Sequence, residues 1–284
     1  MSTINADQKL SNYLTNDILS YLDCPRKAPT LRYLNRLIYA YIRKVPWESV
    51  SRIIKRHVNP ETKDCPRWPA EFWRDAIQHG LGGTCYESSL AFYSLLSTLG
   101  FEGYLTVNDM GDTIGCHAAV IVWLDGQKYL VDVTIPVHAA VCIHPKKTIR
   151  RKTAFLDFTI RPVRENVYQV ERSHHPKRNA FTLIDMAVSL PDYRAIVTDD
   201  YQDATGRFLK SVVIVKVVGE KTVRFFSDLK PYKLESFSRG GKEEIMIEPE
   251  RLPEILAGIF QMPEGSISAA LACVRAPPIP FDLS

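Results

Sequence analysis

The stretch Gly82-Gly83-Thr84-Cys85-Tyr86-Glu87-Ser88-Ser89 places a cysteine directly after two glycines and at the start of a long apolar helical pattern. At a helix start, Cys85 lies among free backbone N–H groups and near the positive end of the helix dipole. This environment favours the thiolate, which is the nucleophilic form of cysteine. The two glycines let the backbone turn sharply and leave room for a substrate carbonyl. The stretch therefore predicts a nucleophilic cysteine that begins a helix.

His117 and Asp132, further along the chain, provide the partners that such a nucleophile needs, namely a base and a group that orients the base. His117 opens an alternating, largely apolar strand pattern, and Asp132 lies near the end of the next strand pattern. Between the two patterns, Asp125-Gly126 is a strong signal for a tight hairpin turn. The hairpin brings His117 and Asp132 close together across two antiparallel strands. Asp132 can then bond one ring nitrogen of His117 and fix its orientation.

Each of these residues also has a structural interpretation. A free cysteine often behaves as a packed core residue, and a histidine at a strand start is often held by local hydrogen bonds. Asp132 is harder to explain in this way, because a carboxylate inside an apolar strand costs free energy unless it is paired. Cys116 adjoins His117 and is the alternative nucleophile, although its strand position favours simple packing.

The pattern on either side of this stretch changes from helical to β-rich. Helices are predicted over residues 31–45, 69–80, 86–99 and 250–260, where apolar residues recur at helical spacing. Strands are predicted over residues 104–107, 117–124, 128–133, 181–189, 194–198, 210–218 and 221–226. Residues 134–180 are predicted to be irregular and basic. A helical start, an antiparallel β middle and a mixed end indicate an α+β architecture with the nucleophile helix packed against a sheet or barrel.

The composition is that of an ordinary soluble globular protein, since 45% of the residues are hydrophobic and 24% are charged. The first 20 residues lack the apolar core of a signal peptide, and no run approaches the ~18 apolar residues that span a bilayer. The net charge of +4 is modest and favours small anionic ligands over nucleic acid. The six cysteines form no CxxC pair, so neither a zinc site nor a disulfide framework is indicated. We expect a cytoplasmic protein without a metal, a nucleic-acid partner or a membrane partner.

Three blocks of the sequence, together with a later segment over residues 250–262, match motifs that occur together in one enzyme family. Val45-Pro46-Trp47-Glu48-Ser49-Val50 is similar to a Val/Ile-Pro-Phe-Glu-Asn-Leu segment, and Gly82-Gly83-Thr84-Cys85-Tyr86-Glu87 is similar to an Arg-Gly-Gly-x-Cys-Phe-Glu motif. His117, Leu124-Asp125-Gly126 and Tyr129-Leu130-Val131-Asp132-Val133 match a histidine strand and an aspartate strand. Residues 250–262 match a C-terminal helix that ends in a similar Ile-Phe pair. With these blocks the chain resembles the arylamine N-acetyltransferase family.

The resemblance implies a fold of three regions around a core like that of the cysteine proteinases. These regions are an N-terminal helical bundle over residues 1–100, a central antiparallel β-barrel over 101–205 and a C-terminal α/β lid over 206–284. The resemblance also implies a ping-pong reaction with acetyl-CoA, or another acyl-CoA, as co-substrate. Cys85 would take the acyl group as a thioester, and an arylamine, hydrazine or arylhydroxylamine nitrogen would attack it. His117 would shuttle the proton, and Asp132 would hold and polarise His117.

The resemblance also points to residues that contact the substrates, and backbone N–H groups near Cys85 are the natural oxyanion donors. The expected substrate-binding residues are Trp47, Gly83, Thr84, Tyr86 and Ile135. Trp47 replaces a family phenylalanine, Ser49 an asparagine, and Leu81 the motif arginine. Asp132-Val133-Thr134-Ile135-Pro136 replaces the family's Asp-Val-Gly-Phe-Gly. We expect these differences to alter the acceptor pocket and the coenzyme A entrance.

Other functions use the same three residues. An amide synthase would take its acyl group from a carrier-protein thioester through a wider cleft. A cysteine peptidase or transglutaminase-like hydrolase would need a cleft for a peptide strand, whereas the similarity over residues 45–50 favours a closed pocket. A binding protein without activity is disfavoured because Cys85, His117 and Asp132 are all present. The sequence therefore predicts an acyl-CoA-dependent N-acyltransferase.

Overall fold

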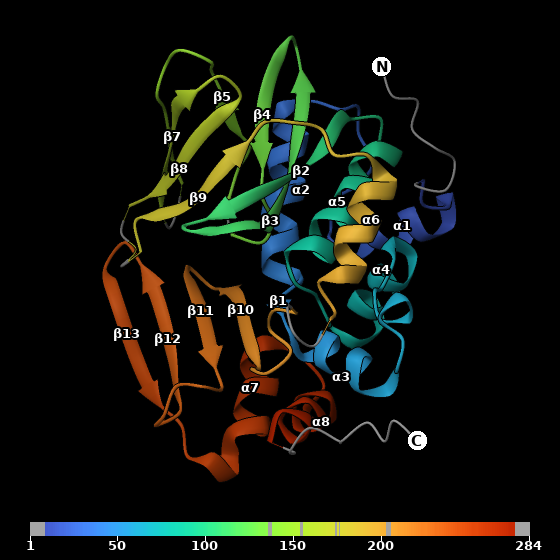
Figure 1. The fold of residues 1–284 in the computed structure, drawn as a ribbon, viewed down its shortest axis with the longest axis vertical. Helices are drawn as coiled ribbons and strands as arrows, with labels where there is room; N and C mark the ends of the chain where they lie inside the picture. The colour runs from blue at the N-terminus through green and yellow to red at the C-terminus, as the bar shows by residue number, and fades with distance from the viewer. Residues whose placement is uncertain are drawn as a thin grey trace.

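The computed structural model describes residues 9–135, 138–153, 156–173, 175, 177–202 and 206–275. Helices form the first part of the molecule, an eight-stranded antiparallel sheet follows, and a five-stranded sheet with two more helices ends it (Figure 1). The predicted α+β class, with a helical bundle, a barrel-like sheet and a C-terminal α/β lid, is confirmed.

The N-terminal helices are α1 (Asn12–Tyr21), α2 (Leu31–Lys44), α3 (Val50–Val58), α4 (Pro69–His79) and α5 (Cys85–Thr98), with a 3₁₀ turn at Thr62–Asp64. Helix α2 begins after Thr30, whose hydroxyl accepts a hydrogen bond from the Tyr33 N–H at 3.2 Å. Helix α4 ends at Gly80, whose φ of 63° lies in the left-handed region that glycine adopts without strain. Both helix boundaries agree with the sequence signals.

Helix α5 is the central helix, and every residue from Cys85 to Ser97 is buried. Hydrogen bonds fix it on two sides. The Trp73 Nε1–H of α4 donates to the Ala91 carbonyl at 3.0 Å, and the Ser89 hydroxyl donates to the Ala118 carbonyl in the sheet at 3.0 Å. The position of the nucleophile helix is therefore set by both the bundle and the sheet.

The larger sheet has the strand order β5-β4-β3-β2-β9-β8-β7-β6. Its strands are β2 (Glu102–Met110), β3 (Thr113–Leu124), β4 (Gln127–Val131), β5 (Val141–Ile143), β6 (Ile149–Lys152), β7 (Asp157–Arg164), β8 (Val167–Arg172) and β9 (Asn179–Ile184). The outer strands β5 and β6 also lie against each other, so the sheet is nearly closed into a barrel.

The turn between β3 and β4 is the predicted tight hairpin. Leu124 pairs with Gln127, and the two residues between them, Asp125 and Gly126, have φ values of 50° and 72°. Two consecutive positive φ values define the turn type that matches the twist of two adjacent strands. This turn fixes the register of the strands that carry His117 and precede Asp132.

The smaller sheet belongs to the C-terminal part but includes one short strand from the N-terminal part. Its order is β1 (Trp47–Glu48), β10 (Val213–Val218), β11 (Lys221–Phe226), β12 (Lys233–Ser238) and β13 (Gly241–Met246). Ser49 joins the two parts, because its hydroxyl donates to the Ser211 carbonyl at 2.8 Å and accepts from the Val213 N–H at 2.9 Å. Strand β1 therefore connects the nucleophile region to the lid.

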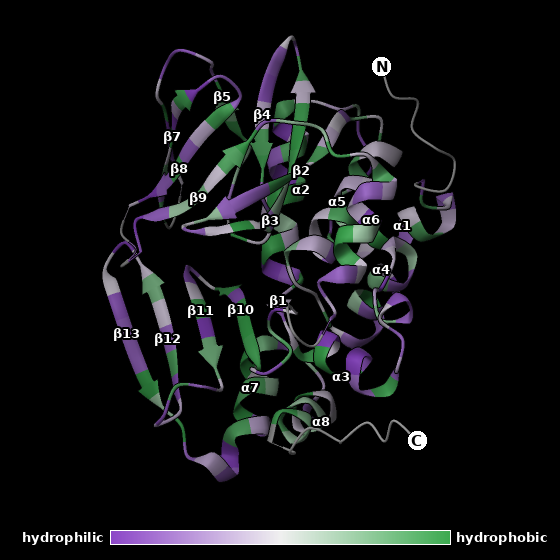
Figure 2. Ribbon diagram, in the orientation of Figure 1, coloured by the Kyte–Doolittle hydropathy of each residue, from purple (hydrophilic) through white to green (hydrophobic). Residues whose placement is uncertain are grey.

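A second apolar core lies below this sheet. Helices α7 (Leu252–Phe260) and α8 (Glu264–Arg275) bury residues such as Leu256 and Ile267 against Val50 and Ile53 of α3. Figure 2 shows the apolar character of α7 and β10, and a β13 that is hydrophilic except at its end, where Ile245 and Met246 are exposed. Helix α8 was not predicted from the sequence, whereas α7 matches the predicted helix over 250–260 apart from a 3₁₀ turn at Pro249–Arg251.

Two sequence predictions are wrong. The segment 134–180, predicted to be irregular, contains strands β5 to β8, whose outward-facing residues are largely polar or basic. Residues 194–198, predicted as a strand, belong to helix α6 (Leu190–Asp199). The Ser189 hydroxyl caps this helix by accepting from the Asp192 N–H, and Pro191 lies in its first turn. Burial of Tyr193 and Val197, four residues apart on one face, favours the helix over a strand.

Within the ranges given above, no helix is both long and apolar enough to cross a membrane.

Candidate active site

Cys85 is the first residue of α5 and is 7% exposed. No side chain caps the amino end of this helix within the described ranges, so its first-turn N–H groups keep their donor capacity. The helix dipole places its positive end beside the sulfur. Cys85 therefore lies at the uncapped, positive end of a buried helix, as the sequence predicts.

His117 on β3 and Asp132 directly after β4 meet across the hairpin. His117 Nε2 and Asp132 Oδ2 are 2.7 Å apart, and both side chains are buried. The second oxygen, Oδ1, accepts from the N–H groups of Thr134 and Ile135 at 2.9 and 3.0 Å and from the Thr134 hydroxyl at 2.9 Å. The carboxylate is thus held in one orientation, and the pair lies as close together as the hairpin predicts.

The charge of His117 follows from these contacts. Burial disfavours the protonated ring, but the charge and hydrogen bond of Asp132 raise the pKa of His117 from 6.5 to about 10. Because Nε2 bonds Asp132, the ring nitrogen left for Cys85 is Nδ1, and the Cys85 Sγ donates to the carbonyl of the adjacent Cys116 at 3.7 Å. The arrangement can therefore supply a nucleophile, a base and an orienting carboxylate.

Trp47 lies beside the nucleophile loop. It forms a parallel β-bridge with Gly83, and its ring meets the ring of Phe208 edge-on with centroids 4.8 Å apart. Ile135, which follows the turn around Asp132, is 8% exposed and belongs to the main apolar core. The structure therefore places Trp47 and Ile135 next to two different parts of the Cys85, His117 and Asp132 group.

Thr84 and Tyr86 flank Cys85. The Thr84 hydroxyl is buried and has no hydrogen-bond partner in the described part of the chain. The Tyr86 hydroxyl donates to the Gly115 carbonyl, and the Tyr86 carbonyl accepts from the Tyr193 hydroxyl at 2.8 Å. Tyr86 therefore joins α5 to β3 and α6, whereas Thr84 retains an unused polar group next to Cys85.

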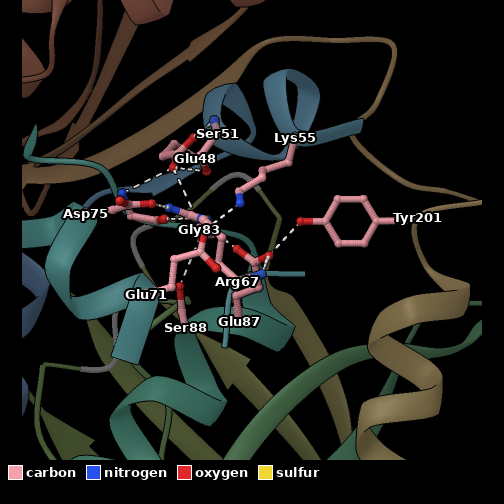
Figure 3. A network of polar contacts seen from close by, with 11 residues as sticks. Glu48, Ser51, Lys55, Arg67, Glu71, Asp75, Gly83, Glu87, Ser88 and Tyr201 are labelled. Atoms are coloured by element: carbon pink, nitrogen blue, oxygen red, sulfur yellow. Dashed lines mark hydrogen bonds and ion pairs between the residues drawn. The ribbon is translucent and has the colours of Figure 1, made fainter. Parts of the chain in front are cut away.

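A buried charged network lies against the two glycines (Figure 3). Arg67 Nη2 lies 2.8 Å from Glu87 Oε2, and Arg67 Nη1 lies 3.1 Å from Asp75 Oδ2. Glu87 also accepts from the Tyr201 hydroxyl at 2.6 Å. Glu48 lies 3.9 Å from Arg67 and accepts from the Ser51 hydroxyl at 2.6 Å.

Burial and charge compete in this network. Burial raises the pKa of Glu48, although Arg67 opposes the shift. Burial also acts to raise the pKa of Glu87, but the charge of Arg67 and several hydrogen bonds lower it overall. The carboxylates in turn hold the pKa of Arg67 above its usual value despite burial. One guanidinium thus organises two fully buried carboxylates next to the nucleophile loop.

The sequence did not single out several residues that shape this site: Glu48, Arg67, Glu87, Thr134, Phe181, Tyr193, Tyr201 and Phe208. Glu48 and Glu87 lie within the matched blocks and carry a signal there as charged residues in apolar surroundings. Arg67 and Tyr201 carry no such signal, because their partners lie far away in the chain. In the described residues, no three or more His, Cys, Asp and Glu side chains form a group that would hold a metal ion.

Solved structures with the same fold are arylamine N-acetyltransferases. That of Mycobacterium abscessus has 18% identity and a TM-score of 0.75, covering 93% of this chain and 95% of that chain. That of Salmonella typhimurium has 13% identity and a TM-score of 0.76, covering 93% of this chain and 99% of that chain. That of Mycobacterium marinum in complex with CoA has 17% identity and a TM-score of 0.74, covering 92% of this chain and 99% of that chain.

Comparison with curated proteins gives no match. A sequence model described as N-acetyltransferase, however, matches residues 30–222, which is more than half of the chain. The matched region contains all three sequence blocks on which the resemblance rests as well as Cys85, His117 and Asp132. The resemblance is confirmed: the chain belongs to the arylamine N-acetyltransferase family and is an acetyltransferase.

Proposed function

We propose that this protein transfers an acetyl group from acetyl-CoA to the nitrogen of an arylamine or hydrazine through a thioester on Cys85. The observation that carries the proposal is the buried group of three residues, in which Cys85 begins α5, its Sγ donates to the carbonyl of Cys116 next to His117 at 3.7 Å, and His117 bonds Asp132 at 2.7 Å. Such an array supplies a nucleophile, a proton carrier and an orienting carboxylate. The CoA complex of the Mycobacterium marinum enzyme supports the choice of donor.

The reaction would proceed in two balanced halves. The Cys85 thiolate attacks the thioester carbonyl of acetyl-CoA, and the coenzyme A sulfur leaves with the proton that His117 carries. The amine nitrogen then attacks the acetyl carbon on Cys85, His117 takes the proton from the nitrogen, and the Cys85 thiolate leaves. Asp132 keeps His117 in one orientation throughout. Each half transfers one acetyl group and one proton, so the enzyme ends as it began.

The oxyanion that forms in each half needs donors. We assign this role to the first-turn N–H groups of α5, which no side chain caps in the described ranges. The Thr84 hydroxyl, buried and without a partner in the same part of the chain, is a further donor for the acetyl group or the oxyanion. An unused buried hydroxyl costs free energy, and a substrate oxygen would satisfy it.

Aromatic side chains lie beside the Gly82–Gly83 turn. Trp47 and Phe208 form an aromatic corner beside Gly83, and Phe208 also lines a cavity of about 310 Å³ whose lining is mixed, with Val213 and Phe226 as well as Lys210, Ser211 and Asp228. A flat aromatic amine buries its ring against such side chains and leaves its nitrogen free. Ile135, in place of the family's aromatic residue, offers an aliphatic surface near Asp132. We propose Trp47 and Ile135 as acceptor-binding residues.

The test is the mass of the intact protein after incubation with acetyl-CoA and no amine. We expect a gain of one acetyl group, which an arylamine or hydrazine then removes. Cys85→Ser should abolish a stable adduct and keep the fold, and Cys116→Ser should leave the adduct intact. An adduct that persists in Cys85→Ser would move the nucleophile elsewhere. No adduct, with Cys85 still reactive toward iodoacetamide, would point to another donor such as a carrier-protein thioester.

A further inference from the structure

The main chain of Gly82 and Gly83, just before Thr84 and Cys85, is held from both sides by the charged network (Figure 3). The Gly82 N–H donates to Glu48 Oε1 at 3.1 Å, and the Gly82 carbonyl accepts from Arg67 Nη2. The Gly83 carbonyl accepts from the Glu48 N–H at 3.3 Å and from the Ser88 hydroxyl at 3.0 Å. The place of the nucleophile loop is therefore set largely by Arg67 and Glu48.

The guanidinium that holds this loop comes from outside it. Arg67 lies between the 3₁₀ turn Thr62–Asp64 and α4, and 15 residues separate it from Gly82. The position just before the two glycines, where the resembling family has an arginine, is Leu81, which packs against the second apolar core. The side chain of Arg67 is 1% exposed, so its hydrogen bonds and ion pairs are made to groups inside the protein.

Steric contacts show how closely the loop and the network fit. A Cβ atom on Gly83 would lie 2.9 Å from Glu87 Oε2 and 3.1 Å from Arg67 Nη2. A Cβ atom on Gly82 would lie 1.7 Å from the Pro46 carbonyl oxygen, which is backbone. Glycine at position 83 lets Arg67 and Glu87 approach the main chain directly, and glycine at position 82 lets the Pro46 carbonyl do so.

Glu87 has a sequence position that normally serves another purpose. Thr84 and Glu87 have the spacing of a capping box, in which each side chain bonds the backbone N–H of the other residue. Neither bond is present among the described residues. The carboxylate of Glu87 instead accepts from the Arg67 side chain, the Arg67 N–H at 3.0 Å and the Tyr201 hydroxyl at 2.6 Å. The network therefore holds the Glu87 carboxylate away from the start of α5. There the carboxylate would compete with a reacting oxygen for the backbone N–H donors.

The charge of Glu87 also matters, because it lies only two residues after Cys85. An unpaired carboxylate there would disfavour the neighbouring thiolate. Arg67 compensates that charge at 2.8 Å, with both side chains 1% exposed. The positive end of α5 is then available to Cys85 and to the oxyanion.

We propose that Arg67 is a positioning residue for the nucleophile: it holds the Gly82–Gly83 turn and keeps Glu87 away from the end of α5, so that Cys85 and the open N–H groups face the acyl donor. The effect on acyl transfer rests on the proposed function, whereas the effect on the reactivity of the Cys85 sulfur does not. The two claims can therefore be tested separately.

The main variant is Arg67→Met/Glu87→Gln, which removes both charges of the 2.8 Å ion pair, while Glu48 keeps its hydrogen bonds from Ser51 and Gly82. Arg67→Lys keeps the charge but cannot serve Gly82, Glu87 and Asp75 with one flat group. The control is Lys55→Met/Glu71→Gln, which removes a nearby, more exposed ion pair that makes no hydrogen bond to Gly82 or Gly83 in the described residues. For each protein we would measure thermal unfolding, the rate of Cys85 alkylation by iodoacetamide against pH, and kcat and KM with acetyl-CoA.

We expect both Arg67 variants to alkylate more slowly near neutral pH, because the Gly82–Gly83 turn loses the guanidinium that holds it. In the double variant, alkylation rate and kcat should fall by ~10²-fold, and KM for acetyl-CoA should change by no more than about threefold. Arg67→Lys should lie between the double variant and the wild type, and the Lys55/Glu71 variant should match the wild type.

A folded Arg67 variant with the alkylation profile and kcat of the wild type would overturn the proposal. An equal loss in the Lys55/Glu71 control would do the same, since it would show a general effect of charge removal. If the wild-type protein alkylates but accepts no acetyl group, the proposed function fails while the alkylation comparison still tests Arg67.

Discussion

The ring of Phe181 packs on the ring of His117, with centroids 4.5 Å apart and planes inclined by 53°. Phe181 lies on β9 and is 1% exposed. The imidazole is therefore held by an apolar face as well as by the carboxylate of Asp132. Two strands that are not hairpin partners of each other, β3 and β9, thus fix the same imidazole ring.

This contact predicts that Phe181 affects the reaction rate as well as the stability of the core. Phe181→Leu should destabilise the protein by about 1 kcal/mol and lower kcat by about tenfold, because the imidazole gains freedom to leave its productive orientation. Phe158→Leu is the matched control, since Phe158 is a fully buried phenylalanine of β7. Urea unfolding and steady-state kinetics on both variants provide the comparison. Equal losses of kcat in the two variants would assign the effect to general core damage.

Asp132 is predicted to control the protonation of His117. Asp132→Asn removes the charge that raises the pKa of His117, and kcat should fall by about 10³- to 10⁴-fold. Asp185→Asn provides the control, because Asp185 is also a buried aspartate but bonds Tyr104 and Lys128. Its variant should keep kcat near the wild-type value. Similar activity in the two variants would remove Asp132 from the mechanism.

The pKa of His117 predicts how stability changes with pH. Its pKa in the folded protein, about 10, exceeds the 6.5 of the free side chain. The folded state therefore binds the proton more tightly, and this contribution is complete below pH ~6.5 and lost as pH rises through about 10. The difference in unfolding free energy between wild type and His117→Gln, measured in urea across this range, should shrink with rising pH. A difference that stays constant would mean that the folded ring is neutral.

Glycine 83 is predicted to be intolerant of even one methyl group. Its Cβ would meet Glu87 Oε2 at 2.9 Å and Phe72 Cε2 at 3.0 Å, so Gly83→Ala should cost about 1–3 kcal/mol of stability. Gly258→Ala is a contrasting change in α7, where an added Cβ meets nothing within 4 Å. There the alanine should stabilise by about 0.5–1 kcal/mol. Thermal unfolding of both variants is the measurement. A Gly83→Ala variant as stable as the wild type would show that Glu87 and Phe72 shift to make room for the methyl group.

Local signals allowed the parts nearest Cys85 to be predicted. The Asp125-Gly126 turn fixed the pairing of two strands, and the Thr30 cap and Gly80 terminus fixed helix boundaries. Such features depend on a few consecutive residues, so they can be recognised from the sequence alone. The proximity of His117 and Asp132 followed from the same turn.

Other parts depended on contacts that no short segment reveals. Residues 194–198 are rich in β-branched side chains, yet the cap at Ser189 and the burial of Tyr193 and Val197 make them helical. Strand β7 buries only Phe158 and Ile160 fully, so its pattern resembles a basic loop. Arg67 was missed for a related reason, since its partners Gly82 and Glu87 lie 15 and 20 residues away.

The contact between Arg67 and the Gly82 carbonyl has a consequence for how enzymes of this kind are found. A search pattern that requires an arginine at position 81 would reject this chain, although a guanidinium occupies the space beside Gly82. The loop needs a buried cation at one point in space, and the chain can deliver it from any segment that reaches that point. Signatures written as consecutive letters will therefore overlook such proteins, whereas a search for the geometry around the nucleophile will recover them.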